Sequence, residues 1–138
     1  MLTRVQSLIG KKCTRASINY NNELHLYFGT RWKLITFDSI WSFSTPLGSV
    51  TSKSRNKNKL QRAIELIEHI PVFNIELWGK TLRIYFQNDC LISIIPKSIN
   101  DKFDAPYFEL FMPRNEVLSF GPHNKWSKKK IGKSQWSK

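Results

Sequence analysis

Few residues in this chain have the types and spacing that catalysis requires. The three histidines, His25, His69 and His123, lie far apart and form no His-Glu-x-x-His pattern, and two cysteines are too few for a Cys-rich zinc site. His25 alternates with Leu24 and Leu26, so we expect a solvent-facing strand residue, with a catalytic base as the alternative. The sequence therefore predicts no metal site and no bound cofactor.

The carboxylates and glycines also lack catalytic patterns. Asp38 and Glu109 fall near corresponding positions of an internal repeat, but nothing places two carboxylates within reach of each other for acid–base chemistry. The six glycines never cluster into a phosphate-binding loop, and no Gly-x-Ser-x-Gly motif occurs. We therefore predict that the protein is not an enzyme.

The residues that could carry function are basic and aromatic. The chain has 22 Lys and Arg against 10 Asp and Glu, a net charge of +12, which attracts acidic partners. Basic segments with aromatic neighbours fit nucleic acid, fit an acidic protein surface equally well, and are often only solvated. The candidate partner-binding residues are Lys11 and Lys12 (with Arg15 nearby), Arg55, Lys57 and Lys59, then Lys97, Asp101 and Lys102, and finally Lys125, Trp126, Lys128, Lys129 and Lys130.

Size and composition predict a single folded domain. A chain of 138 residues with 41% hydrophobic and 13% aromatic residues can bury a core despite its charge. We expect Cys13 and Cys90 to be buried free thiols. No apolar run approaches the roughly 18 residues of a membrane helix, and the first residues do not resemble a secretory signal, so we expect a cytoplasmic protein. The oligomeric state stays open.

Alternating apolar and polar residues predict a mainly β fold of the α+β type. Leu24–Phe28 and Leu82–Phe86 alternate in the same phase, 58 residues apart, and each lies between two other β-prone segments. Further along, Trp41–Val50 matches Phe108–Val117 at an offset of 67. The alternative is chance similarity between strands.

The matching segments predict an internal duplication. We expect two repeated antiparallel units of three to four strands that form one sheet, a sandwich or a half-barrel. The change of offset predicts an insertion of nine residues in the second copy, within Pro96–Ala105. Pro46 and Pro113 are expected to end a strand in each copy.

An amphipathic helix is expected between the copies. Its apolar residues have helical spacing and Pro71 ends it; we expect this face to pack on the sheet, with a partner-binding helix as the alternative. The predicted organisation is one domain over residues 1–122, with repeat 1 at about 8–52, the helical linker at about 55–70 and repeat 2 at about 66–120. Residues 123–138 are expected to form a basic, flexible tail.

Several short motifs resemble those of a known class. Leu8-Ile9-Gly10-Lys11-Lys12, Leu24-x-Leu-x-Phe28 and Trp41-x-Phe-x-x-Pro-x-Gly48, followed by a longer copy that ends Phe120-Gly121-Pro122, resemble small bacterial immunity proteins encoded beside polymorphic or contact-dependent toxins. The resemblance covers residues 8–122. It implies a β-rich antitoxin that occludes the active site of one cognate toxin.

The chain departs from this class in two respects. Glu68 and His69 stand where the first copy has Gly10 and Lys11. Immunity proteins that inhibit basic nucleases are often acidic, whereas this chain is basic, so the resemblance implies a toxin with an acidic face. The alternative function is a nucleic-acid-binding accessory protein that uses the basic patches.

Overall fold

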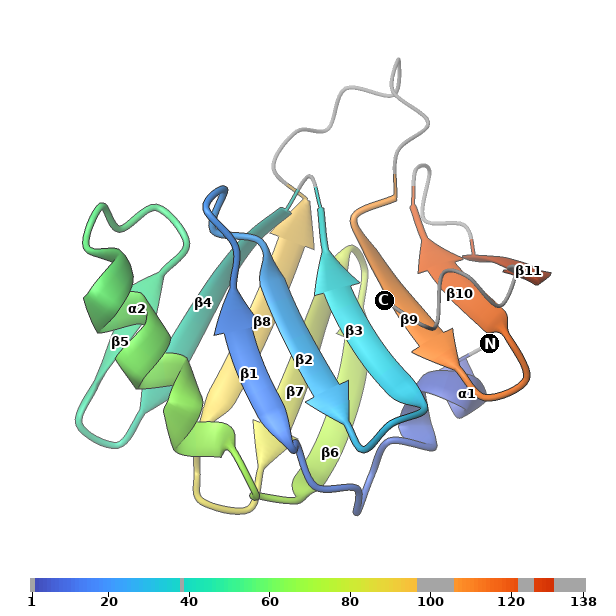
Figure 1. The fold of residues 1–138 in the computed structure, drawn as a ribbon, viewed down its shortest axis with the longest axis horizontal. Helices are drawn as coiled ribbons and strands as arrows, with labels where there is room; N and C mark the ends of the chain where they lie inside the picture. Colours follow the sequence, from blue (N-terminus) through green and yellow to red (C-terminus); the bar gives the residue numbers. More distant parts are fainter. Residues whose placement is uncertain (1, 38, 97–105, 122–125, 131–138) are drawn as a thin grey trace.

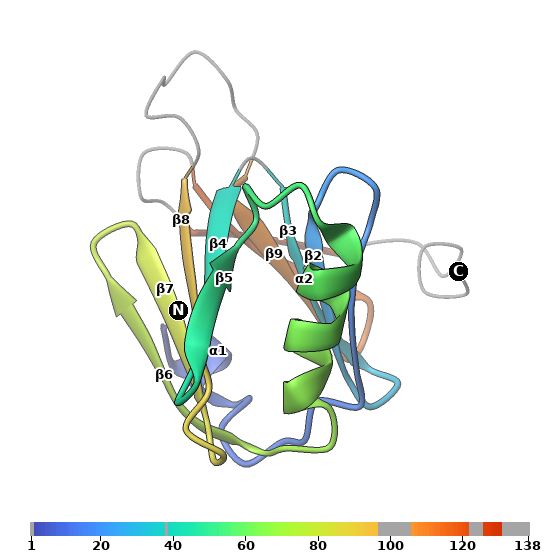
Figure 2. The same cartoon turned by 90° about the vertical axis from the view of Figure 1, so that its left-hand side faces the viewer.

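The computed structural model describes residues 2–37, 39–96, 106–121 and 126–130, most of which belong to β-strands (Figure 1). These strands form two antiparallel sheets that lie face to face (Figure 2). Sheet 1 has the order β1-β2-β3-β9-β10-β11 and sheet 2 the order β5-β4-β8-β7-β6. The predicted mainly β fold is therefore confirmed, in the form of a sandwich.

The strands have the following bounds. Sheet 1 contains β1 (Arg15–Ile18), β2 (Leu24–Phe28), β3 (Trp32–Thr36), β9 (Phe108–Met112), β10 (Glu116–Phe120) and β11 (Trp126–Lys130). Sheet 2 contains β4 (Ser39–Thr45), β5 (Gly48–Thr51), β6 (Val72–Trp78), β7 (Thr81–Phe86) and β8 (Leu91–Pro96).

The core lies between the two sheets and follows from strand alternation. In β2, the side chains of Leu24, Leu26 and Phe28 are buried while the two residues between them are only half-buried. Buried residues of both sheets form one contiguous hydrophobic cluster, which includes Trp41 and Phe108. Apolar side chains on the two inner faces therefore hold the sandwich together.

The two sequence copies form units that are interleaved in space. In each unit, three consecutive strands form a meander and the next two form a hairpin, over β1–β5 in the first unit and β6–β10 in the second. Each hairpin joins the sheet of the other unit, because β3 pairs with β9 and β4 pairs with β8. A unit thus has five strands rather than three to four, because Pro46 and Pro113 lie in hairpin turns that lead into one more strand.

The register of these pairings is the same in both sheets. Leu34 pairs with Leu110 in sheet 1, and the residues that correspond to them by sequence offset, Ile92 and Phe43, pair in sheet 2. The pairings of the outer strands differ by one residue between the two sheets. One cause is a bulge in β6, and the other is the turn between β9 and β10, which is one residue longer than the turn between β4 and β5. The interleaving therefore repeats residue by residue at the centre of each sheet.

The segments that precede the two meanders also pair with each other. The Gly10 N–H donates to the Val72 carbonyl at 2.8 Å, and the His69 N–H donates to the Cys13 carbonyl at 2.5 Å. Gly10 and His69 both have positive φ, 89° and 69°. His69 is therefore the counterpart of Gly10 and not of Lys11, so the departure noted at Glu68 and His69 reflects a one-residue shift in the alignment.

The described helices are short. The first, α1 (Leu2–Gln6), precedes the first unit, and α2 (Lys57–Ile64) continues into a 3₁₀ turn, η1 (Glu65–Ile67). The Asn56 side chain caps α2 by accepting from the Lys59 N–H, and the helical segment is shorter than the predicted residues 55–70. Its apolar residues Leu60, Ile64 and Ile67 are buried, as expected for a face that packs on the sheets. No described helix has the length and apolar character needed to cross a membrane.

Side chains from the α2 region cover the outer edge of β1. The Ala16 N–H donates to Glu68 Oε2 at 2.9 Å, and the Ile18 N–H donates to Gln61 Oε1 at 3.1 Å. Gln61 Nε2 donates in return to the Ala16 carbonyl at 3.0 Å. These contacts satisfy backbone groups that would otherwise form an exposed sheet edge.

Part of the predicted flexible tail has regular structure. Trp126–Lys130 forms β11, which pairs antiparallel with β10. The sequence lacked alternation here, but pairing with an existing strand supplies the backbone hydrogen bonds that a lysine-rich segment needs, and lysines are common on edge strands. The predicted inserted loop and the rest of the tail lie at residues 97–105, 122–125 and 131–138, outside the described residues.

Candidate interaction surface

A row of basic and aromatic side chains crosses the outer face of sheet 1. Arg15 pairs with Tyr27, and Tyr27 pairs with Lys33, so the three residues lie side by side on β1, β2 and β3. The Arg15 guanidinium lies 5.8 Å from the centre of the Tyr27 ring, and Lys33 Nζ lies 4.9 Å from it. One ring therefore orders two cations that come from the strands on either side of it.

A second cation–aromatic pair lies at the same end of the sheet. Lys11 Nζ is 5.4 Å from the centre of the Trp32 ring, and the neighbouring Arg31 is exposed in the turn before β3. Arg31 shares a small hollow with Arg114, which comes from the other unit. We name the basic–aromatic surface by Arg15, Tyr27 and Lys33 on the outer face and by Lys11, Arg31 and Trp32 at the same end of the sheet, where Trp32 also packs against the core.

His25 lies beside this surface and is half-buried, contrary to the expectation of a solvent-facing residue. Its Nε2 is buried and has no hydrogen-bond partner. Burial, together with the charge of Lys33, lowers the pKa of His25. The imidazole therefore stays neutral next to the cations near neutral pH.

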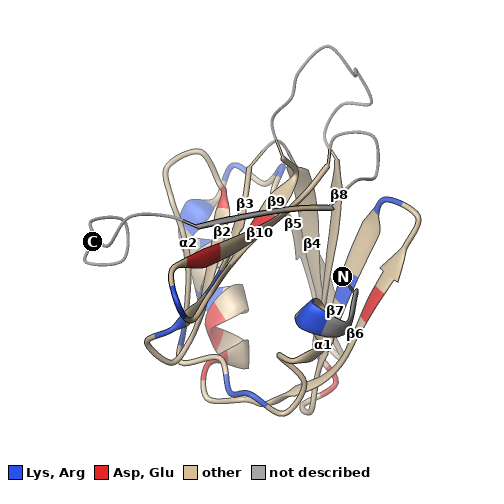
Figure 3. Ribbon diagram, turned by 90° about the vertical axis from the view of Figure 1, so that its right-hand side faces the viewer, with Lys and Arg blue, Asp and Glu red and all other residues tan. Residues whose placement is uncertain are grey.

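The predicted partner-binding residues do not form one patch. Lys11 belongs to the basic–aromatic surface and Lys12 is exposed next to it, whereas Arg55, Lys57 and Lys59 are exposed at the start of α2. Trp126, Lys128, Lys129 and Lys130 belong to β11, at the opposite edge of sheet 1 from β1. Lys97, Asp101, Lys102 and Lys125 lie outside the described residues. Figure 3 shows Lys and Arg mainly in turns and helices and Glu on strands such as β6 and β10.

The prediction missed Tyr27, Arg31, Trp32 and Lys33. A usable signal was present, because the hairpin turns after Ile18 and Phe28 fix how the first three strands pair. With that register, the polar positions of these strands fall in one row. Reading each basic segment separately could not show this arrangement.

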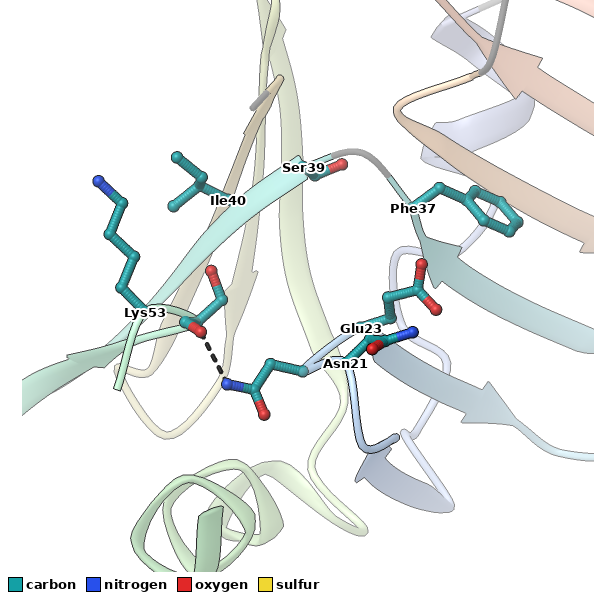
Figure 4. Close-up of a pocket in the computed structure, with 8 residues that line it drawn as sticks. Asn21, Glu23, Phe37, Ser39, Ile40 and Lys53 are labelled. Atoms are coloured by element: carbon teal, nitrogen blue, oxygen red, sulfur yellow. Dashed lines mark hydrogen bonds between the residues drawn. The ribbon is translucent and has the colours of Figure 1, made fainter. Parts of the chain in front are cut away.

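A polar pocket of about 510 Å³ lies between the turn that joins β1 to β2 and the start of β4 (Figure 4). Its lining residues are Asn21, Asn22, Glu23, Phe37, Ser39, Ile40, Ser52 and Lys53. Asn22 Nδ2 donates to the Ser52 carbonyl at 2.8 Å, and the buried Trp41 Nε1 donates to the Asn22 carbonyl at 2.7 Å. These contacts join the first hairpin to the segment that follows β5. Its described lining contains one carboxylate, that of Glu23, and one ammonium group, that of Lys53.

The thiols are poorly suited to nucleophilic chemistry. Burial raises the pKa of Cys13 to about 12, and burial also raises the pKa of Cys90. Both cysteines are free and buried, as predicted. Among the residues that the structure describes, no three His, Cys, Asp or Glu side chains are placed to hold a metal ion.

Comparison of the chain with protein-family models, with curated proteins and with solved structures finds no match. The functional interpretation therefore depends on the residues of this chain and on their arrangement.

Proposed function

We propose that this protein is a non-catalytic immunity protein whose basic–aromatic surface binds an acidic face of one cognate bacterial toxin in the cytoplasm. The observation that carries the proposal is the ordered row of Arg15, Tyr27 and Lys33 on the outer face of sheet 1. A cation that already rests against a ring loses less side-chain freedom when a partner binds. The short motifs that resemble those of immunity proteins support the same function.

The arrangement of the rings favours an acidic protein over nucleic acid. Stacking on an unpaired base requires a free aromatic face. Tyr27 has cations from both neighbouring strands near its ring, and Trp32 has Lys11 near its ring. The cations can still bind carboxylates through charge-assisted hydrogen bonds, and the net charge of +12 would speed the encounter with an acidic partner.

A nucleic-acid-binding accessory protein is the second candidate. It is favoured by the additional exposed cations at the same end of sheet 1, namely Lys12, Arg31 and Arg114. This function would need only phosphate contacts, so its affinity would fall steeply as the salt concentration rises.

The proposal is tested by expressing the chain together with the product of the adjacent gene. We expect a stoichiometric complex and protection of the cells from toxicity. The variant Arg15→Glu/Lys33→Glu should lose protection, whereas Lys53→Glu/Arg55→Glu, which makes the same change of charge at two other exposed residues, should keep it. The proposal is wrong if no complex forms, or if the protein binds RNA or DNA at physiological salt and both variants protect equally.

A further inference from the structure

A groove lies between α2 and the hairpin of β4 and β5. It consists of two adjoining hollows of about 280 and 490 Å³, both lined by Val50, Lys59 and Ala63. Two apolar side chains at its border are largely exposed, Leu47 at 99% and Leu66 at 56%. Both side chains therefore leave apolar surface open to solvent beside the groove.

The same place in the other unit is filled by the chain itself. The counterpart of β5 is β10, which pairs with β11 on its outer side, whereas β4 is the one described strand that pairs with β5. The sheet orders are otherwise equivalent, so the position beside β5 corresponds to the position of β11. This equivalence shows that an antiparallel strand is the element that fits there.

The groove exists because two small residues replace an ion pair. Arg4 in α1 contacts Glu116 in β10, with Nη2 and Oε1 3.6 Å apart. The paired segments 10–13 and 69–72 make His69 the counterpart of Gly10. Ala63 precedes His69 by as many residues as Arg4 precedes Gly10, so Ala63 is the counterpart of Arg4. Glu116 pairs with Met112 in β9, and Gly48 pairs with Thr45, the counterpart of Met112 in β4. Gly48 is therefore the counterpart of Glu116. Ala63 and Gly48 are too small to contact each other across the space between α2 and the hairpin of β4 and β5. The groove therefore stays open.

The positive charge at the border of the groove favours an occupant with acidic side chains. Lys59 and Arg62 border the groove, and no acidic residue belongs to its lining. In a strand added beside β5, alternate side chains would point toward α2, where they would meet these two cations and the apolar Ala63 and Leu66. Acidic and apolar side chains on that face of the strand are complementary to the groove.

We propose that the groove binds an extended segment of a partner protein, which adds as a strand to β5 and presents acidic and apolar side chains to α2. A second copy of this chain is a poor occupant, because pairing of two β5 strands would bring Lys59 and Arg62 of one copy toward the same cations of the other. The groove is separate from the basic–aromatic surface on sheet 1, so the two proposals can fail independently.

The test uses the full-length protein and a fluorescent peptide, Thr-Glu-Thr-Val-Thr-Glu-Thr-Val-Thr, measured by fluorescence anisotropy. A matched peptide has Lys in place of Glu, and a second has Pro in place of the inner Thr residues, which removes backbone N–H donors. We expect the acidic peptide to bind about tenfold more tightly than either control peptide, since each lost set of contacts is worth at least about 1.4 kcal/mol.

Variants locate the binding site. Ala63→Leu fills the groove with a good helix former, and Lys59→Glu/Arg62→Glu reverses its charge; each should weaken peptide binding about tenfold or more. Arg83→Glu, at an exposed residue of β7, and Arg15→Glu/Lys33→Glu should leave the affinity within about threefold of wild type, and circular dichroism should show that all variants are folded.

Three results would overturn the proposal. The first is equal binding of the acidic peptide to wild type and to Ala63→Leu. The second is equal binding of the proline peptide, because strand addition would then not be the mode of binding. The third is a wild-type dimer in sedimentation velocity that Ala63→Leu converts to a monomer, which would make a second copy the occupant.

Discussion

The two units of this protein agree in their centres and differ at their edges. Where β3 meets β9 and β4 meets β8, the residues pair in the same register, and the buried inner-face residues there are apolar except for Thr36. At the edges, β1 is covered by Gln61 and Glu68, and β10 is extended by β11, whereas β5 has β4 as its one neighbour in the part of the chain that the structure describes.

This difference shows which part of the repeat is constrained by packing. A shift of one residue in a central strand would turn its apolar side chains toward solvent, so the register of both units is fixed. An edge has only one neighbouring strand and tolerates charge, insertions and extra strands. The groove beside β5 lies at such an edge. The basic–aromatic surface lies mainly on the outer face of β1, β2 and β3, where packing of the core does not constrain the side chains.

The largest expected effect tests the equivalence of the two centres. Trp41 and Phe108 occupy corresponding positions and are 0% and 1% exposed. We expect Trp41→Ala and Phe108→Ala each to lower the free energy of unfolding by about 3–5 kcal/mol in urea denaturation, because both leave a cavity in the shared core. A cost below about 1 kcal/mol for either variant would contradict the proposed packing.

A matched substitution sharpens this comparison. Trp41→Phe gives the first unit the residue of the second, and it removes the hydrogen bond from Trp41 Nε1 to the Asn22 carbonyl. We expect a loss of roughly 1–3 kcal/mol, smaller than that of Trp41→Ala. Equal losses for the two variants would mean that the ring itself contributes little at this position.

An intermediate effect is expected at the covered edge. Glu68→Ala removes the acceptor of the Ala16 N–H, so we expect a loss of about 1–3 kcal/mol in unfolding free energy and faster hydrogen exchange of this amide. Gln87→Ala, at an exposed position after β7, is the control and should change stability by less than about 0.5 kcal/mol. Unchanged exchange of the Ala16 amide would show that Glu68 does not protect the edge.

The smallest effect concerns pH and His25. Burial and Lys33 lower the pKa of His25 from 6.5 in the folded protein, so the unfolded chain takes up this proton at a higher pH than the folded one. This contribution to stability is therefore present above pH 6.5 and is lost as pH falls below it. His25→Gln should flatten the dependence of unfolding free energy on pH in that window. An unchanged slope in His25→Gln would contradict this contribution.

Much of the architecture could be predicted from the sequence. Alternation gave the central strands, and the repeated order of segments indicated two units, because both signals come from local burial. The exchange of hairpins between the sheets could not be predicted, since local patterns do not specify which sheet a hairpin joins. The strand β11 was missed because its lysine-rich residues lack alternation and depend on β10 for pairing.

The candidate site was predicted only in part. Lys11 was found because it belongs to a basic run in the sequence. Tyr27 and Lys33 are brought together by the pairing of β2 with β3, so their significance emerges only in three dimensions. Basic runs report the charge of a segment, whereas a binding surface depends on which segments are neighbours.

The most direct test of the proposed function is isothermal titration of the adjacent gene's toxin domain into wild type and two charge-reversal variants at physiological salt. We expect wild type to bind the toxin domain one to one. Arg15→Glu/Lys33→Glu should reduce the affinity about tenfold or more, and Lys53→Glu/Arg55→Glu should change it by less than about threefold. Equal affinities for the two variants, or no binding by wild type, would contradict it.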